Sequence, residues 1–325
     1  YLSLCSQSVE KIHPSPDGDK ILEIEVTSNR PDCLSVIGIA REANAALKSN
    51  GFSSSFLPPK KEKINLTSLP KLPLKVTITP PSICPRFCAL LIENVKVGPS
   101  PKIIQERLKK SGIRAIDNVV DISNYLMIET GQPIHTFDYD KILDQKMIMR
   151  LSKKGEAVTT LDGVTRELPG GDIVIEDGKG RLIDLCGIMG GENSAIDKNT
   201  KRVLFFVQAY DPVLIRRTSM LLGHRTEAAM RFERGIDLEA IPEVVFRGAK
   251  LIAQNANGKI ASQLVDIYPR KKSPKIVSLN FAKAAKIINA SLKPEKIIES
   301  LTLLEFRLQK KTKEEPIFLV PSFRS

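Results

Sequence analysis

A mixed α+β fold with more than one domain is predicted by this sequence, on three observations. The chain has 325 residues, which exceeds the size of one average domain. Short stretches with the periodicity of strands alternate with stretches of helical periodicity. Residues 51–72 are rich in Ser, Lys, Pro and Gly and are typical of a linker, so we expect a boundary there.

The elements before this linker are a strand and a helix. Residues 21–26 alternate apolar and acidic side chains, which is the pattern of a half-buried strand. The next residues break the pattern, and Asp32 is a suitable N-cap for a helix. From 34 to 47 apolar residues recur at helical spacing, which predicts an amphipathic helix.

Residues 73–270 predict one mixed α+β domain of ordinary size. Longer strands are expected at 74–79, 89–97 and 203–210, and a Gly-rich turn at 187–195. Shorter strands are expected at 119–123, 146–152, 172–177 and 181–188, and helices at 101–111, 212–222 and 240–255.

A small third unit is expected from 276 to 325. It begins with a strand, continues with a helix at 281–288 and a helix that starts at Pro294, and ends with strands at 305–309 and 316–320. The two helices suggest an independent nucleic-acid binder as one alternative. The strands around them and the lack of an aromatic face argue against it.

The charge of the chain is compatible with a polyanionic partner. The formal net charge is +12 and the pI is near 9.4, which fits a nucleic-acid partner but equally a basic soluble protein. The chain lacks tryptophan and has five tyrosines, so a surface that stacks many bases is not expected. No segment has the roughly 18 unbroken apolar residues of a membrane helix, and no signal peptide is predicted.

The five cysteines do not predict a metal site. Cys84 and Cys88 are four positions apart and lack a second pair, so zinc is not expected. Buried thiols in a reducing compartment are the simpler interpretation. The chain starts at Tyr1 instead of Met and ends just after an apolar run, so we expect a piece of a longer protein.

Four long segments of unusual composition carry a family resemblance. They are EIEVTSNRPDCLSVIGIARE (23–42), NVVDISNYLMIETGQPIHTFDYDKI (118–142), GIMGGENSAI (187–196) and RRTSMLLGHRTEAAMRFERGID (216–237). In this order and at these separations, together with VPSFR at 320–324, they resemble bacterial phenylalanine–tRNA ligase β subunits. None of the four is a generic motif that many folds share.

The resemblance implies an organisation for the chain. Residues 1–50 resemble the second part of a split N-terminal B1 domain, 73–270 the B3/B4 editing domain, and 276–325 a truncated B5 domain. The parent enzyme is a cytoplasmic heterotetramer with an α subunit that uses ATP and Mg²⁺ to charge tRNA(Phe). The fragment itself is expected to hold no cofactor or metal, to have no membrane contact and to be a monomer.

The implied activity of the B3/B4 domain is hydrolysis of mischarged Tyr-tRNA(Phe). Residues that match the family's pocket are His135 and Asn124 near the reacting ester, and a set that contacts the substrate: Arg114, Ser123, Pro133, Gly190, Gly191, Thr226 and Ala228. The ordinary pKa of histidine, about 6.5, suits proton transfer near neutral pH. Orienting a water is the expected role of His135.

Each of these residues also has a purely structural interpretation. His135 can be a hydrogen-bonded residue after a turn, and Gly190 and Gly191 can form a tight turn. Arg114 alone indicates a surface arginine. Ser123, Asn124 and Thr226 are ordinary turn or cap residues.

One position departs from the family pattern. The resemblance places Phe206 where the family has a glutamate that accepts a hydrogen bond from the tyrosine hydroxyl. A buried hydroxyl without a partner costs about 1–3 kcal/mol. Because side chains two apart on a strand share a face, Gln208 is a possible replacement. The sequence therefore predicts weakened editing, and a non-hydrolytic scaffold that orients tRNA and supports assembly is the alternative.

Overall fold

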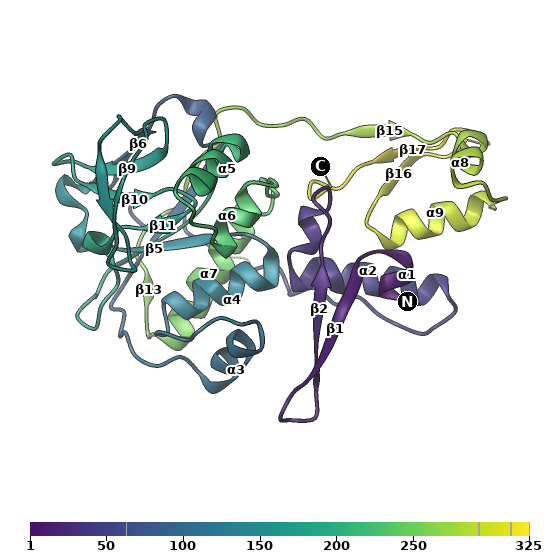
Figure 1. Ribbon diagram of the computed structural model, residues 1–325, viewed down its shortest axis with the longest axis horizontal. Coiled ribbons are helices and arrows are strands. Elements are labelled where there is room, and N and C mark those ends of the chain that lie inside the picture. Colours follow the sequence, from purple (N-terminus) through teal and green to yellow (C-terminus); the bar gives the residue numbers. More distant parts are fainter. Residues whose placement is uncertain (63, 292, 313, 325) are drawn as a thin grey trace. The chain divides into compact units, whose positions relative to one another are not determined.

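The computed structural model describes residues 1–62, 64–291, 293–312 and 314–324 (Figure 1). The chain folds into two compact units. Unit 1 combines Tyr1–Pro59 with Lys271–Ser325, and unit 2 is Lys60–Arg270. Both mix helices with strands, which confirms the predicted α+β class. No helix in the described ranges combines the length and the apolar character needed to cross a membrane.

Unit 2 contains two five-stranded sheets and a small hairpin. The first sheet has the order β11-β10-β9-β6-β3, in which only the β3–β6 pair is parallel. Its strands are β3 (Lys75–Ile78), β6 (Lys146–Leu151), β9 (Ile173–Asp177), β10 (Leu182–Leu185) and β11 (Met189–Gly190). The hairpin is β7 (Ala157–Thr159) with β8 (Thr165–Glu167).

The second sheet of unit 2 is antiparallel and has β4 near its centre. The order is β13-β4-β12-β5, and β14 also pairs with β4. Its strands are β4 (Arg86–Glu93), β5 (Ile134–Asp138), β12 (Val203–Ala209), β13 (Lys259–Ile260) and β14 (Val265–Ile267). In β12 every residue is buried, because both faces of this sheet are covered.

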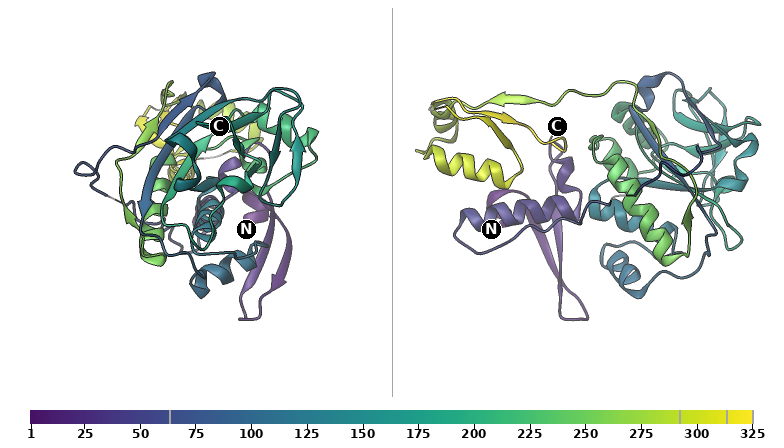
Figure 2. Two further views of the ribbon diagram at one scale, coloured as in Figure 1. Left: turned by 90° about the vertical axis from the view of Figure 1, so that its left-hand side faces the viewer. Right: turned by 180° about the vertical axis from the view of Figure 1, so that it is seen from behind.

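Alternation along β12 assigns its residues to two cores. Leu204 and Phe206 pack in the core between the two sheets, whereas Val203 and Phe205 pack in a second core beneath helices. Gln208 and Tyr210 continue the first face, since residues two apart point the same way. The unit is thus layered as sheet, sheet and helices (Figure 2).

Five helices in the described residues complete unit 2, and an N-cap side chain starts two of them. Asp211 accepts hydrogen bonds from the first turn of α5, and Thr226 accepts one from Ala229 N at the start of α6. The helices are α3 (Lys102–Lys110), α4 (Val120–Thr130), α5 (Pro212–Leu221), α6 (Glu227–Phe232) and α7 (Ile241–Asn255).

The sequence prediction of a strand at 119–123 is wrong, because this segment begins α4. Its β-branched residues favour a strand in isolation. The Asp117 carboxylate instead accepts hydrogen bonds from Val119 N and Val120 N at 2.8 and 2.9 Å, which satisfies the free amides of a helix start. The helix ends at Gly131, whose φ of 77° is the left-handed conformation that glycine adopts readily.

Unit 1 joins the two ends of the chain. The hairpin of β1 (Ser8–Pro14) and β2 (Lys20–Glu25) extends away from the rest of the unit (Figures 1 and 2). Helix α2 (Val36–Ser49) contacts α9 (Pro294–Leu303). The remaining elements are α1 (Leu2–Cys5), α8 (Phe281–Ile288) and a sheet of order β15-β17-β16, formed by Ile276–Ser278, Ile317–Leu319 and Arg307–Lys310.

Two details of unit 1 differ from the sequence prediction. Ser35 caps α2 by accepting from Gly38 N, whereas Asp32 lies in a 3₁₀ turn before it. Strand β2 is mostly exposed instead of half-buried, since it pairs only with β1. The 3₁₀ turns of the chain are Pro31–Cys33, Pro81–Ile83, Tyr139–Lys141, Leu143–Gln145 and Glu192–Ser194.

Candidate functional site

His135 and Gly190 meet where the edges of the two sheets of unit 2 come together. His135 lies on the edge strand β5 and Gly190 on the edge strand β11. A Cβ atom built on Gly190 would lie 2.4 Å from Cε1 and 2.5 Å from Nε2 of His135. The imidazole therefore packs directly on glycine backbone, and no larger residue fits at 190 without moving it.

Aromatic rings fill the space behind His135. Phe206 lies directly opposite His135 in the β12–β5 ladder, and their ring centroids are 5.5 Å apart. Phe206 is 0% exposed and also packs against Phe137 at 5.0 Å and Phe87 at 5.5 Å. The position to which the resemblance assigns a hydrogen-bond acceptor is thus part of an apolar cluster.

Burial lowers the pKa of His135 to about 4, because the imidazolium loses hydration among these rings. The sequence analysis used the ordinary pKa of a free histidine, and the apolar surroundings change it. At neutral pH the ring is uncharged and offers one donor and one acceptor nitrogen. Such a group is suited to orient a water molecule and is a poor base.

This burial predicts a pH-dependent stability. The unfolded chain takes up the His135 proton near its ordinary pKa of 6.5 and the folded chain only near 4. The unfolded state therefore binds more protons in this window, and stability falls as the pH falls through it. His135→Gln is expected to remove about 2 kcal/mol of the stability loss between pH 7 and pH 5. Urea unfolding at both pH values measures it.

The control for this experiment is His13→Gln, at an exposed position of the β1–β2 hairpin. We expect it to keep the part of the pH slope that His135 contributes, because His135 is unchanged in this variant. Equal slopes for the wild type and His135→Gln would show that His135 titrates in the folded protein as it does in the unfolded chain.

Gly191, Thr226 and Ala228 lie around the same strand. Gly191 N donates to Ile183 O, and a Cβ at 191 would lie 2.7 Å from that oxygen. Thr226 Oγ1 donates to Ile188 O at 3.1 Å, which ties the start of α6 to the segment before β11. Ala228 packs against the core between the sheets. Thr226 thus has its hydroxyl engaged by backbone.

The predicted residues on α4 and in the loop before it lie in a different layer. Ser123 is buried and its Oγ donates to Val120 O at 2.6 Å, while Asn124 is half-buried. Arg114 is exposed in the loop between α3 and α4. Pro133 is buried just before β5. No hydrogen bond or ion pair in the described part of the chain joins Arg114, Ser123 or Asn124 to His135.

Two buried polar residues near the site were not found by sequence reasoning. Asp184 is 3% exposed on β10, and Tyr210 is 3% exposed just after β12. Asp184 pairs directly with Gly190 across the β10–β11 ladder. Burial raises the pKa of the Asp184 carboxyl to about 8. The only signal in the sequence is one carboxylate inside the apolar run LIDLCGI.

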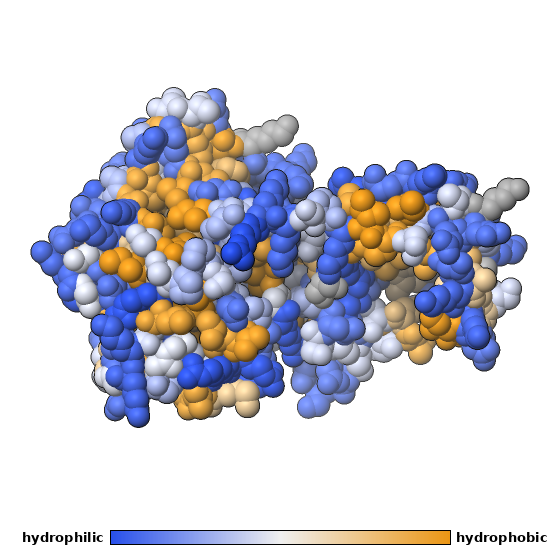
Figure 3. Space-filling model, turned by 90° about the horizontal axis from the view of Figure 1, so that it is seen from above, coloured by the Kyte–Doolittle hydropathy of each residue, from blue (hydrophilic) through white to orange (hydrophobic). Residues whose placement is uncertain are grey.

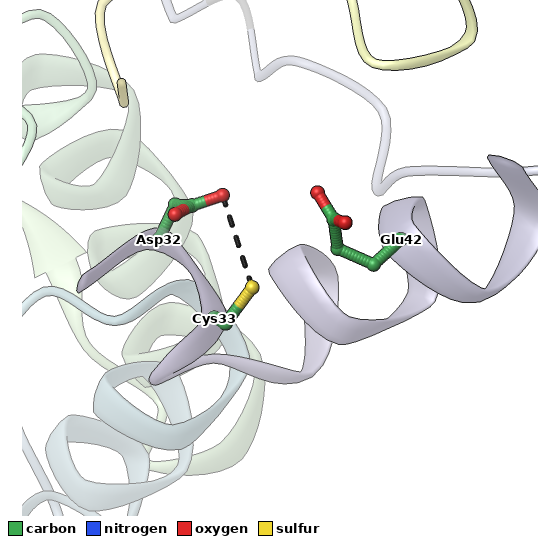
Figure 4. Close-up of side chains that lie close together, drawn as sticks. All are labelled: Asp32, Cys33 and Glu42. Carbon is green, nitrogen blue, oxygen red and sulfur yellow. Dashed lines mark hydrogen bonds between the residues drawn. The ribbon is translucent and has the colours of Figure 1, made fainter. Parts of the chain in front are cut away.

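A cluster of Asp32, Cys33 and Glu42 in unit 1 has the residue types of a metal site (Figure 4). Two arginines neutralise it. Arg30 contacts Asp32 at 3.0 Å and also Glu42, and Arg324 contacts Glu42 at 2.9 Å. The carboxylates already have positive partners, so the cluster does not suit a divalent cation.

Two cavities were characterised, and neither includes His135 among its lining residues. One of about 390 Å³ lies beside β7 and β10 and is lined by Ala157, Val158, Thr159, Leu182, Glu192 and Asn193. The other, of about 500 Å³, lies along α8 in unit 1. Figure 3 shows apolar patches among hydrophilic residues on one face, and Ile287 and Ile288 of α8 are among the exposed apolar residues. His135 itself is half-buried between the two sheet edges.

Comparison with known proteins gives relatives over nearly the whole chain. Residues 83–257 match the B3/4 domain family. The phenylalanine–tRNA ligase beta subunit of Carboxydothermus hydrogenoformans is 40% identical over 94% of this chain and 37% of its own length. The beta subunit of Moorella thermoacetica is 39% identical over 90% of this chain and 36% of its own.

A solved structure covers all of this chain at low similarity. An N-terminal fragment of the phenylalanyl-tRNA synthetase beta subunit from Pyrococcus horikoshii aligns over 100% of this chain and 88% of its own, with a TM-score of 0.47 and 15% identity. The chain spans little more than a third of the length of the curated relatives. The match of residues 83–257 covers more than half of the chain, which therefore belongs to the B3/4 domain family and is a relative of bacterial phenylalanine–tRNA ligase beta subunits.

Proposed function

We propose that this chain is part of a cytoplasmic phenylalanine–tRNA ligase beta subunit whose B3/4 domain hydrolyses mischarged Tyr-tRNA(Phe), with weakened selectivity for tyrosine. The observation that carries the proposal is the neutral His135 imidazole held against the bare Gly190 backbone. The relatives are named as subunits of this ligase. The B1, linker, B3/B4 and B5 boundaries at 1–50, 51–72, 73–270 and 276–325 belong to the same proposal.

The ligase needs a hydrolytic site in addition to its synthetic site, because phenylalanine and tyrosine differ by one hydroxyl. A hydrophobic pocket rejects an analogue with an added hydroxyl by only about a hundredfold. An aminoacyl ester is already reactive, so a site that binds the terminal adenosine and orients a water accelerates hydrolysis without a covalent nucleophile. Neutral His135 supplies the acceptor nitrogen for that water.

The glycine backbone opposite His135 has a defined part in this proposal. Gly190 allows the ester to approach its backbone closely, because glycine has no side chain. Its strand partner is Asp184, so it lies at the edge of a regular ladder and is held rigidly. Arg114 is the expected contact for the tRNA phosphates, since its exposed guanidinium is available to anions. Asn124 is a further candidate for orienting the water.

Weakened selectivity follows from the surroundings of Phe206. This side chain is fully buried among Phe87, Phe137 and His135 and cannot accept a hydrogen bond. Gln208 lies two residues further on the same face, and its buried Oε1 has no hydrogen-bond partner among the described residues. A neutral amide oxygen accepts a weaker hydrogen bond from a phenol than a carboxylate does.

The tight packing of Phe206 also favours the second candidate function. In this case the domain is a scaffold that orients tRNA(Phe) and supports the alpha subunit without hydrolysis. Charging of tRNA(Phe), with ATP and Mg²⁺, belongs in either case to the whole ligase. We assign no step of that reaction to this chain, because its described acidic cluster is occupied by arginines.

Deacylation of Tyr-tRNA(Phe) by the assembled ligase distinguishes the two candidates. We expect the wild type to hydrolyse the ester faster than the uncatalysed reaction, and His135→Ala to lower this rate about tenfold or more, since losing the hydrogen bond that orients the water costs about 1–3 kcal/mol. Phe-tRNA(Phe) synthesis should be unchanged in the variant. A wild-type rate no higher than that of the uncatalysed reaction would establish the scaffold.

Gly190→Ala is a second variant for the same assay. Its methyl group displaces the His135 imidazole without removing it. We expect a loss similar to that of His135→Ala, whereas Gly98→Ala, at a position with open space and without a left-handed φ, serves as the control for glycine replacement. An active Gly190→Ala enzyme would contradict the assigned position of the imidazole.

A further inference from the structure

Asp184 is a buried carboxyl that the proposed mechanism does not use. It lies on β10 and is 3% exposed. Its strongest side-chain partner is the thiol of Cys186, which is a weak hydrogen-bonding group. Asp172 in the same sheet layer shows the contrast, because its carboxylate accepts from Ser152 Oγ and Thr218 Oγ1 at 2.9 and 2.7 Å. Asp184 lacks such oxygen donors among the described residues.

Other polar groups without partners lie on the same side. The hydroxyl of Tyr210 makes no hydrogen bond of good geometry in the described ranges, and only the weak thiol of Cys186 lies within hydrogen-bonding reach of it. Gln208 Oε1 is also without a partner there. Tyr210 and Gln208 share the face of β12 that points between the sheets. Buried polar groups are nearly always hydrogen-bonded, so these two groups, beside a carboxyl whose only described side-chain partner is a thiol, indicate a ligand.

The geometry connects this polar group to the His135 site. Asp184 is the direct ladder partner of Gly190, so the two Cα atoms are about 5 Å apart and their side-chain directions share a face. That direction at Gly190 points at His135. A ligand whose ester lies at His135 therefore has Asp184 about one aromatic ring away. Leu161, which is 50% exposed, touches the same glycine, so the site lies near the surface.

Keeping a carboxyl here has a cost in stability. Burial raises the pKa of Asp184 to about 8, so the group is mostly protonated at neutral pH. An apolar residue of similar size would avoid the cost and would give up only the weak hydrogen bond with the Cys186 thiol. Buried ionisable groups with strongly shifted pKa values, which lower the stability of the fold, concentrate at functional sites.

We propose that Asp184 is the residue that recognises the phenol hydroxyl of a tyrosyl ester, in place of the acceptor that the resemblance assigns to position 206. This inference rests on the proposed function. Asp184 donates its carboxyl O–H to the phenol oxygen, and the phenol O–H donates to Gln208 Oε1. A phenylalanyl ester leaves both groups without partners, which disfavours its binding.

The test uses the amide analogues in which L-tyrosine or L-phenylalanine is joined to 3′-amino-3′-deoxyadenosine. These analogues cannot be hydrolysed, so binding is measured separately from catalysis. Calorimetry with the assembled ligase compares the wild type, Asp184→Asn and Asp184→Leu. Any binding at the synthetic site is the same in all three and cancels in the comparison. Asp184→Asn keeps the shape of the side chain. It is the variant used for the binding comparison if Asp184→Leu does not fold.

We expect the wild type to bind the tyrosyl analogue about tenfold more tightly than the phenylalanyl analogue. Asp184→Leu should bind the two equally, and Asp184→Asn should keep part of the preference, since an amide also hydrogen-bonds a phenol. Equal binding of the two analogues by the wild type, or a preference unchanged in Asp184→Leu, would overturn the assignment. Selective binding by a wild type that does not deacylate Tyr-tRNA(Phe) would uphold it and reject the hydrolytic function alone.

Discussion

Replacing Phe206 by alanine is expected to lower the free energy of unfolding of unit 2 by about 3–5 kcal/mol. The ring is fully buried between the sheets and packs against three other rings. Its removal loses the transfer free energy of the side chain and leaves a cavity that regular strands on either side cannot close. Urea unfolding followed by circular dichroism measures the change.

Leu161→Ala is the matched control for this experiment. Leu161 lies near the same site but is 50% exposed, so we expect a change within about 0.5 kcal/mol. A loss below 1 kcal/mol in Phe206→Ala would mean that the cluster of rings rearranges to fill the space. In that event the site is more adaptable than its packing indicates, and a substrate ring is accommodated more readily.

The second large effect concerns Asp184 and alkaline pH. Because the folded protein keeps the Asp184 proton up to about pH 8 and the unfolded chain loses it near 3.8, the folded state binds more protons in this window. Stability is therefore present at low pH and is lost as the pH rises through the folded pKa. Over the full window the loss is about 6 kcal/mol.

Asp184→Asn should remove this slope, so its stability relative to the wild type rises steadily from pH 5 to pH 8. Asp177→Asn is the control, since that buried carboxylate bonds Arg181 and has a lowered pKa. Its effect should be constant over the same range, because both folded and unfolded forms are ionised there. Parallel profiles for Asp184→Asn and Asp177→Asn would show that Asp184 is ionised in the folded protein.

Much of the fold was predictable because periodicity and end signals agree locally. The apolar run at 203–210 forms β12, and the helix predicted at 281–288 is α8. The segment at 119–123 was not predicted correctly, because its β-branched residues favour a strand whereas the capping Asp117 favours the start of a helix. The order of strands in the two sheets has no local signal, since pairing depends on which apolar faces meet.

The candidate site was likewise predictable only in part from the sequence. Family resemblance identified His135, Gly190 and Phe206, but their mutual contact depends on two sheet edges meeting, which no spacing in the sequence encodes. The lowered pKa of His135 likewise comes from rings contributed by other strands. Asp184 was missed because a single carboxylate in an apolar run has the same appearance whether it faces solvent or a core.

The hydrogen bonds from Gln263 N to Pro70 O and from its side chain to Leu69 O, both 2.8 Å, have a consequence for folding order. They fasten the segment that enters unit 2 to a segment near the end of that unit. Unit 1 is assembled from the two extremities of the polypeptide, so an unfolded unit 2 is a long tether whose ends must find each other. Once unit 2 has folded, these hydrogen bonds hold its two ends together and lower the entropy that the two parts of unit 1 lose on meeting. Destabilising unit 2 should therefore slow the formation of unit 1.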